Sequence, residues 1–330
     1  MVWDDVAMTD GFYKQLLEDS IEVFSNRCSR RGAVVGDRSV GDRLANDLAE
    51  HDLRDCLIGY FEQDESVQLR RYSLPSYRFE QLMEMSPDTI IITADADKEG
   101  YLAALADVIP GAPKVIVAGY GHFDFRDSRY WEIASNLGEP SLANGYPNSR
   151  IHLYQCLVNA SKRSLDGIVV EFGMFRGGTT MFLSQVIEQL GKEWPIIGFD
   201  TFSGFPARRS YLDMYDHVDL NRVDLTEVQS YLAGRNVEVV PGDIQETVSR
   251  LAERPIVLAF VDTDNFTPAV AAIEAVRNNV VPGGALVFDH LTGVDRFRYT
   301  LGERMAAWRL FDDPRYFNLH GTGVFIRQVG

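Results

Sequence analysis

The sequence is poor in cysteine and contains no long apolar run. Its 330 residues include three cysteines, Cys28, Cys56 and Cys156, which lie far apart and lack the spacing of metal ligands. They are most simply reduced thiols, so we expect a cytoplasmic protein. No apolar run approaches the roughly 20 residues of a transmembrane helix. Residues 1–20 lack the basic segment and apolar core of a signal peptide, so none is expected.

An excess of positive charge is also absent. The chain has 32 lysines and arginines against 48 aspartates and glutamates, which leaves a net charge of -16. The resulting field repels nucleic-acid phosphates and anionic membrane surfaces, so we expect neither nucleic acid nor a membrane as a partner. No repeat or low-complexity tract occurs, and the length is enough for two domains.

Strands that alternate with helices predict two α/β domains. The first is expected over residues 1–125, with strands at 33–35, 56–61, 89–93 and 114–118 and helices at 42–51, 77–85 and 98–108. Residues 126–150 are rich in Gly, Pro, Asn and Ser and are expected to form a linker. The second domain is expected over residues 151–330. Its predicted strands are 168–172, 195–199, 237–240, 256–261, 285–288 and 323–327, and its predicted helices are 151–164, 178–190, 227–233, 246–252, 267–277 and 296–308. This alternation predicts a doubly wound sheet with a late antiparallel strand.

The segment 169–180, Val-Val-Glu-Phe-Gly-Met-Phe-Arg-Gly-Gly-Thr-Thr, is the most informative part of the chain. It reads as a buried strand, a glycine-rich turn and the start of a helix, and the next strand ends in Asp200. This is the layout of a nucleotide-binding site, in which glycines admit the ligand and the carboxylate binds a ribose diol. The pyrophosphate fingerprint Gly-x-Gly-x-x-Gly is absent, so S-adenosylmethionine fits better than a dinucleotide. The alternative is a tight turn that binds no ligand.

Polar residues follow five successive predicted strands of the second domain. They are Glu171 with Gly173, Asp200, Asp243, Asp262 with Asp264, and Asp289 with His290. Ligands in such sheets bind at the carboxyl ends of the strands, so we expect these side chains along one rim. Asp243 could reach an adenine amino group or could cap the next helix. The last two groups suit a hard divalent ion such as magnesium, and His290 could act as a general base. The alternatives are a structural carboxylate at Asp262 and a histidine satisfied by loop backbone at His290.

Four segments resemble the macrocin O-methyltransferase (TylF-like) family of class I S-adenosylmethionine-dependent methyltransferases. They are Val-Glu-Phe-Gly-Met-Phe-Arg-Gly-Gly-Thr at 170–179, Phe-Asp-Thr-Phe-Ser-Gly-Phe-Pro at 199–206, Val-Asp-Thr-Asp at 261–264 and Pro-Gly-Gly-Ala-Leu-Val-Phe-Asp-His at 282–290. The resemblance covers about residues 150–330. It implies a Rossmann-like class I methyltransferase sheet, preceded here by a smaller α/β accessory domain. It also implies O-methylation of a sugar or natural-product hydroxyl in antibiotic-type biosynthesis, usually with Mg2+.

The resemblance further implies roles for particular residues. The expected cofactor-binding residues are Glu171, Gly173, Arg176, Gly177, Asp200, Thr201, Ser203, Asp243 and Ile244. Asp262 and His290 are the expected catalytic residues, and Asp262, Asp289 and His290 are the expected metal ligands. His290 departs from the family, which has a second aspartate there. Metal binding could therefore be weaker, could use Asp264, or could be replaced by histidine acting as a base.

Other functions remain open from the sequence. They are N-methylation of a natural-product intermediate, an NAD or nucleotide-sugar enzyme using the first domain, and an inert cofactor-binding regulatory protein. The first domain has half a nucleotide fingerprint, Gly36-x-x-x-x-Gly41, but is expected to be an accessory domain that packs, shapes the cleft or forms a homodimer. The segment from Arg208 to Arg222, with Tyr211, Tyr215 and His217, is either a lid over the small-molecule acceptor or a solvated loop.

Overall fold

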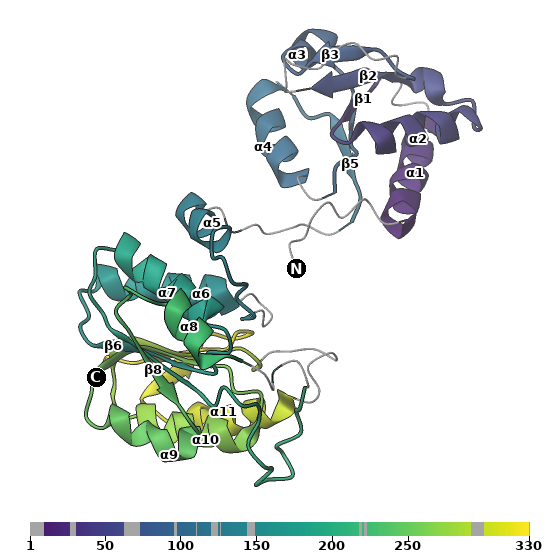
Figure 1. Cartoon of the computed structure of the whole chain (residues 1–330). Helices are drawn as coiled ribbons and strands as arrows, with labels where there is room; N and C mark the ends of the chain where they lie inside the picture. The colour runs from purple at the N-terminus through teal and green to yellow at the C-terminus, as the bar shows by residue number, and fades with distance from the viewer. Residues whose placement is uncertain are drawn as a thin grey trace. The chain divides into compact units, whose positions relative to one another are not determined.

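The chain folds into two compact units, residues 1–124 and residues 125–330 (Figure 1). The computed structural model describes residues 10–26, 31–62, 73–95, 98–109, 111–119, 125, 127–143, 149–217, 220, 223–291 and 300–329. Within these ranges, no helix is both long and apolar enough to cross a membrane.

The first unit is built on a five-stranded parallel sheet. Its elements are α1 Asp10–Ser25, β1 Gly32–Val35, α2 Arg38–Ala49, the 3-10 turn η1 Arg54–Cys56, β2 Leu57–Glu62, β3 Ser76–Arg78, α3 Gln81–Met85, β4 Thr89–Ile92, α4 Lys98–Val108 and β5 Lys114–Val117. The strand order is β3-β2-β1-β4-β5. Side chains of α1 and α2 cover one face of the sheet, and those of α3 and α4 cover the other. The unit is therefore a small doubly wound α/β domain.

The second unit is built on a seven-stranded sheet of order β11-β12-β10-β9-β6-β7-β8. Its elements are α5 Ser128–Ala134, α6 Ser149–Lys162, β6 Ile168–Phe172, α7 Gly178–Gln189, β7 Ile196–Asp200, α8 Leu225–Tyr231, β8 Val237–Pro241, α9 Ile244–Thr247, the 3-10 turn η3 Val248–Leu251, β9 Ile256–Val261, α10 Phe266–Val276, β10 Val280–Phe288, α11 Leu301–Phe311, β11 Tyr316–Asn318 and β12 Val324–Arg327. Only β12 runs antiparallel to its neighbours β10 and β11. The predicted doubly wound sheet with a late antiparallel strand is confirmed.

Both faces of this second sheet are buried. Alternate residues of β6 point to opposite faces, so Val169 packs with α6 and α7 while Val170 packs with α10 and α11. Figure 1 shows α5 to α8 on one side of the sheet and α9 to α11 on the other. Burial on both faces explains why β6 and β9 are continuous apolar runs in the sequence. The strand order reverses between β6 and β9, which opens a crevice at their carboxyl ends.

Residues 126–150 were expected to form a linker, but this segment contains a helix that packs into the second unit. It contains α5, whose Tyr130 and Ile133 are buried in the core of the second unit with Leu153 and Phe182. Tyr130, Ile133 and Leu137 keep a helical spacing, which the glycine- and proline-rich residues after them obscured. Residues 126 and 144–148 lie outside the described residues.

Short strands account for the other differences. The predicted helix 77–85 begins as β3 and becomes helical only at α3, and β11 was not predicted. The predicted turn Pro282-Gly283-Gly284 lies inside β10, where the register with β9 shifts between Val280 and Ala285. An irregularity of this kind tolerates proline and glycine because local ladder bonds are absent. The predicted helix 296–308 is described from residue 300 on, where α11 runs from Leu301 to Phe311.

Candidate active site

A cavity of about 380 Å³ lies at the carboxyl ends of the central strands of the second unit. Most of the residues that the sequence placed on one rim line it: Gly173, Asp200, Asp243, Asp262, Asp264, Asp289 and His290. The predicted cofactor residues Thr201 and Ile244 line it as well. Four further predicted cofactor residues, Glu171, Arg176, Gly177 and Ser203, are not among the lining residues. The cavity thus joins a glycine-rich turn at one side to a cluster of acids and a histidine at the other.

The turn between β6 and α7 depends on two glycines. Gly173 has a φ of +92°, and a Cβ there would overlap the carbonyl oxygen of Asp262. Gly177, with a φ of +82°, is the N-cap of α7. Both positions favour glycine because side chains rarely adopt a positive φ. The close approach of Gly173 to Asp262 brings the two halves of the cavity together.

Glu171 lies beneath this turn rather than in the cavity. Its side chain is buried and accepts a hydrogen bond from the Thr180 hydroxyl on α7. Burial raises the pKa of Glu171 to about 8, with a smaller rise from the charge of Asp200 and an opposing effect of the Thr180 bond. Glu171 is therefore a largely neutral group at pH 7 that ties β6 to α7.

Asp200 holds the glycine-rich turn against its own loop. One carboxylate oxygen accepts a hydrogen bond from the backbone N–H of Phe175 at 2.8 Å, and the other accepts one from Phe202 at 2.8 Å. Burial raises the pKa of the Asp200 carboxyl, and these N–H groups oppose that rise. Asp200 also lines the cavity, so its carboxylate lies next to the space in which a ligand would bind.

Asp243 caps the next helix, which is one of the two roles that the sequence left open, and its contact with an adenine stays a prediction. It is the N-cap of α9, where its carboxylate accepts from the N–H of Gln245 at 2.9 Å, and it also lines the cavity. Its second oxygen lies 2.9 Å from the guanidinium of Arg209. Asp243 therefore links α9 to the segment that follows β7.

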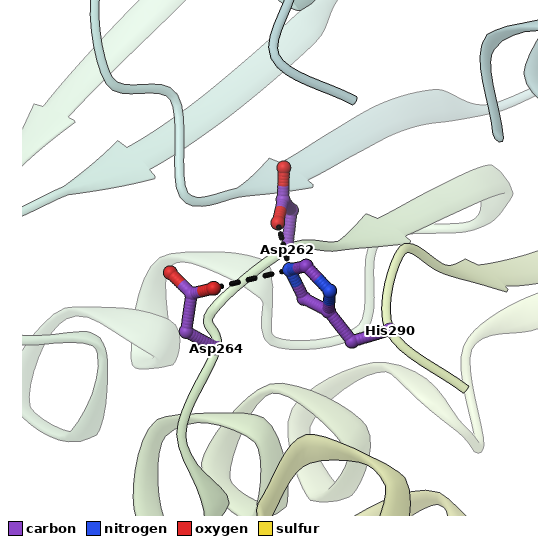
Figure 2. Close-up of side chains that lie close together, drawn as sticks. All are labelled: Asp262, Asp264 and His290. Atoms are coloured by element: carbon purple, nitrogen blue, oxygen red, sulfur yellow. Dashed lines mark ion pairs between the residues drawn. The ribbon is translucent and has the colours of Figure 1, made fainter. Parts of the chain in front are cut away.

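The opposite end of the cavity holds the cluster of acids and histidine. Nε2 of His290 lies 3.0 Å from Oδ1 of Asp264, 3.3 Å from Oδ1 of Asp262 and 3.5 Å from Oδ2 of Asp289. Figure 2 shows the carboxylates of Asp262 and Asp264 directed at the imidazole of His290. One donor atom from each of these three residues lies within 4.8 Å of the others. Asp264, for which the family resemblance implied only an alternative role as a ligand, is thus closer to His290 than Asp289 is.

The buried carboxylates change the titration of the cluster. Burial alone would lower the pKa of His290, but its bonds to Asp262 and Asp264 and the charges of Glu303 and Asp289 raise it well above the usual value. Burial, and then the charge of Asp289, raise the pKa of Asp262 well above its ordinary range. This part of the cavity therefore contains more carboxyl groups than groups that can carry a positive charge.

Glu303 of α11 binds the backbone of the loops that carry the cluster of acids and histidine. Its side chain is fully buried, and one oxygen accepts from the N–H groups of Thr263 at 2.8 Å and Asp264 at 3.0 Å. The other oxygen accepts from the N–H of His290 at 3.1 Å. One side chain thus connects the loops after β9 and β10. Its shortest hydrogen bonds are to backbone N–H groups, so no residue pattern in the sequence pointed to it.

Aromatic and apolar side chains form the remaining wall. The rings of Phe205 and Tyr215 meet edge to face at a centroid distance of 5.5 Å, and Pro206, Leu220 and Pro268 also line the cavity. Asn265 fixes the backbone of Tyr215 by accepting from its N–H at 2.9 Å and donating to its carbonyl at 3.0 Å. Tyr211, by contrast, is exposed. Arg222, the last residue of the expected lid, lies outside the described residues.

The motif Gly36-x-x-x-x-Gly41 of the first unit, which is half a nucleotide fingerprint, lies where helix and strand pack closely. Gly41 lies inside α2, where a Cβ would press into the ring of Tyr60 on β2. Asp37 caps α2 by accepting from the N–H groups of Ser39 and Val40. Glu62, at the carboxyl end of β2, forms an ion pair with Arg38. These contacts explain the motif by helix capping and close helix–strand packing.

A divalent cation fits the donor set of the second unit. Three carboxylates and one imidazole face a common space, and carboxylate oxygen with imidazole nitrogen is a usual ligand combination for such ions. An S-adenosylmethionine molecule fits as well, since the turn at Gly173 and the carboxylate of Asp200 face the adjoining space.

Comparisons with known proteins found methyltransferases to which the chain is similar. A family model described as Macrocin-O-methyltransferase (TylF) matches residues 140–328. A protein from Streptomyces olivaceus, 8-demethyl-8-(2,3-dimethoxy-alpha-L-rhamnosyl)-tetracenomycin-C 4'-O-methyltransferase, is 23% identical over 194 residues, which are 54% of this chain and 72% of that protein. Among solved structures, the O-methyltransferase NovP is 18% identical, covers 55% of this chain and 79% of its own, and has a TM-score of 0.46. The calicheamicin methyltransferase CalS11 is 20% identical, covers 63% of this chain and 98% of its own, and also has a TM-score of 0.46.

Proposed function

The chain belongs to the macrocin-O-methyltransferase (TylF) family and is an S-adenosylmethionine-dependent methyltransferase; we propose that it methylates a hydroxyl of a sugar carried by a natural product. The observation that supports this best is the single cavity in which a glycine-rich turn and Asp200 adjoin the cluster around His290. Methyl donor and acceptor must meet in such a space, because transfer is an in-line displacement at a sulfonium.

In this proposal the cofactor occupies the half of the cavity nearest β6, β7 and β8. Asp200 accepts hydrogen bonds from the ribose diol, and Thr201 lies beside it. Ile244, which is buried and lines the cavity, packs against the adenine ring, with Asp243 at its edge. Gly173 lets the methionine portion approach the backbone. We give Glu171, Arg176, Gly177 and Ser203 no direct contact, since they do not line the cavity.

The acceptor hydroxyl lies beside the cluster of acids and histidine. A hydroxyl is a weak nucleophile until it loses its proton, so a base must stand near it. We assign that role to Asp262, because burial and Asp289 raise its proton affinity, and we assign His290 to holding and polarising Asp262. A divalent cation, for which the family resemblance implies magnesium, would have Asp262 and His290 among its ligands. With that cation bound, the hydroxyl would be activated by the cation, which lowers its pKa, in place of the base.

The wall of Phe205 and Tyr215 supports a sugar acceptor. Sugar rings present C–H faces that pack on aromatic rings, while their hydroxyls need polar partners, and this cavity offers both on adjoining walls. The name of the Streptomyces olivaceus relative describes methylation of a rhamnosyl group. We therefore propose a deoxysugar of a glycosylated natural product as the acceptor.

Isothermal titration calorimetry with S-adenosylmethionine and S-adenosylhomocysteine tests the proposal first, with NAD as the control titrant. We expect the two adenosyl ligands to bind and NAD to give no heat. Binding of NAD alone would overturn the proposal. A panel of glycosylated natural products and nucleotide-linked deoxysugars is then assayed by mass spectrometry for the gain of one methyl group. Methylation of aglycone hydroxyls with no product from any sugar would overturn the choice of acceptor.

A further inference from the structure

We infer that the cluster of Asp262, Asp264 and His290 selects a first-row transition-metal ion of the Fe2+ to Zn2+ class over magnesium. The inference rests on the proposed function and names the kind of ion that assists it. It concerns the position where this chain has a histidine in place of the second aspartate expected from the family resemblance.

Two of the spacings between the donor atoms match neighbouring corners of a coordination sphere, and the third is at most 4.8 Å. In an octahedral site with metal–ligand distances of about 2.1 Å, adjacent ligands are about 3 Å apart. Nε2 of His290 lies 3.0 Å from Oδ1 of Asp264 and 3.3 Å from Oδ1 of Asp262. The two carboxylates come from the loop after β9 and the imidazole from the loop after β10, and all three residues line the cavity.

The charge of the cluster favours a doubly charged ion. Three aspartates surround the imidazole, and their side chains are 18%, 16% and 1% exposed for Asp262, Asp264 and Asp289. Buried carboxylates are costly unless they are paired or bind a cation. One imidazolium offsets only one of the three. A divalent cation with neutral His290 as a ligand offsets two of them and leaves no cationic group in competition.

The imidazole decides which divalent ion is favoured. Magnesium is hard and prefers an all-oxygen shell with several waters. Imidazole nitrogen suits Zn2+, Fe2+, Ni2+ and Cu2+, whose affinity for mixed nitrogen and oxygen sites exceeds that of the oxygen-preferring ions. A second aspartate in place of His290 would return the site to oxygen ligands. His290 is therefore the residue that sets the selectivity.

Glu303 fixes the positions of two expected metal ligands independently of any bound ion. It accepts hydrogen bonds from the N–H groups of Asp264 and His290, and so fixes the backbone of two ligands from different loops. The N–H of Asp262 donates to the carbonyl of Phe172 at 2.9 Å, which fixes the third. Ligands held in this way resist rearrangement into an all-oxygen set around magnesium.

The test measures metal affinity rather than activity. The whole protein, freed of metal by chelation, is titrated with Co2+, Zn2+ and Mg2+ by calorimetry, and the Co2+ complex is recorded by visible absorption. We expect Co2+ and Zn2+ to bind at least about tenfold more tightly than Mg2+. In His290→Asp that preference should shrink by about tenfold or more, with a shift of the Co2+ band, while His320→Asp, a control at an exposed histidine, should behave as the wild type.

The outcomes separate this inference from the proposed function. Equal or tighter binding of Mg2+ by the wild type, or no metal binding at all, overturns the inference even if His290→Asp fails to fold. An unchanged preference in a folded His290→Asp overturns the role of His290. Binding of S-adenosylmethionine is measured on the same samples. If it persists when the metal preference is absent, the inference fails and the proposed function stands; if it is absent, the proposed function fails.

Discussion

The carboxylate of Asp213 accepts hydrogen bonds from both the backbone N–H and the hydroxyl of Thr267, at 2.8 Å and 2.7 Å. Asp213 lies in the segment after β7, and Thr267 lies in the first turn of α10. The same carboxylate accepts from the N–H groups of Arg209 and Ser210. These bonds lower the pKa of Asp213 although burial opposes them. The segment that carries Tyr215 into the cavity is therefore anchored to α10.

Replacing Asp213 by alanine should loosen this anchor. A buried carboxylate with four hydrogen-bond donors stabilises the fold by about 2–4 kcal/mol, and its loss should also free Tyr215. We expect a lower urea midpoint and a raised KM for the acceptor, with little change in the affinity for S-adenosylmethionine. Asp216→Ala, at an exposed position of the same segment, is the control. Equal effects of the two substitutions would contradict the anchoring role.

Replacing Gly173 by alanine should disrupt the junction between the two halves of the cavity. The added Cβ would collide with the carbonyl oxygen of Asp262, and the φ of +92° adds strain. We expect a loss of about 2–4 kcal/mol in unfolding free energy and no detectable cofactor binding. Gly234→Ala is the matched control, since Gly234 has a φ of +80° but open space around it; it should cost about 1 kcal/mol. Retention of cofactor binding by Gly173→Ala would count against the predicted contact.

The stability of the cofactor-free protein should depend on pH through Glu171. Its pKa is about 8 in the folded protein against 4.5 as the ordinary value, so the folded state keeps a proton that the unfolded state releases. The stabilisation is complete below about pH 4.5 and is lost as pH rises through about 8. Urea unfolding between these limits should show wild-type stability falling relative to Glu171→Gln, which is neutral throughout. A constant difference between the two proteins would refute this explanation.

Substitutions of Asp200 and Asp262 should impair different steps, namely cofactor binding and methyl transfer. Asp200→Ala removes both the expected ribose partner and the acceptor of the Phe175 and Phe202 N–H groups, so we expect it to abolish S-adenosylmethionine binding. Asp262→Ala should leave that binding intact and remove turnover, because Asp262 lies in the cluster at the acceptor side. Calorimetry and a methyl-transfer assay on both variants separate the two roles. Near-wild-type turnover of Asp262→Ala would exclude Asp262 as the base.

The strands that carry the site could be predicted because they are buried on both faces. The runs at 168–172 and 256–261 are continuous and apolar, and turn signals follow them, so their ends could be placed to within a residue. The three-residue strands β3 and β11 could not be predicted, because so short a segment shows no periodicity. Helix α5 was obscured by the glycines and prolines that follow it.

The chemical identity of the site came from residue types that the sequence displays directly. Asp200, Asp262, Asp289 and His290 follow predicted strands, and parallel strands place their carboxyl ends on one rim, so their meeting in one cavity was predicted. The family resemblance also followed from local motifs and is confirmed by the match over residues 140–328. These features depend on residues that lie close together in the chain or on the general geometry of parallel sheets.

Only the tertiary structure decided which groups contact one another. It placed Asp264 closer to His290 than Asp289 is, and it assigned Glu303 to the backbone of both loops. It also anchored Asp213, in the segment expected to be a lid or a loop, to Thr267 of α10. These contacts join residues far apart in sequence, and many of them end on backbone N–H groups. Every residue except proline carries that donor, so the sequence contains no mark of where such a bond will form.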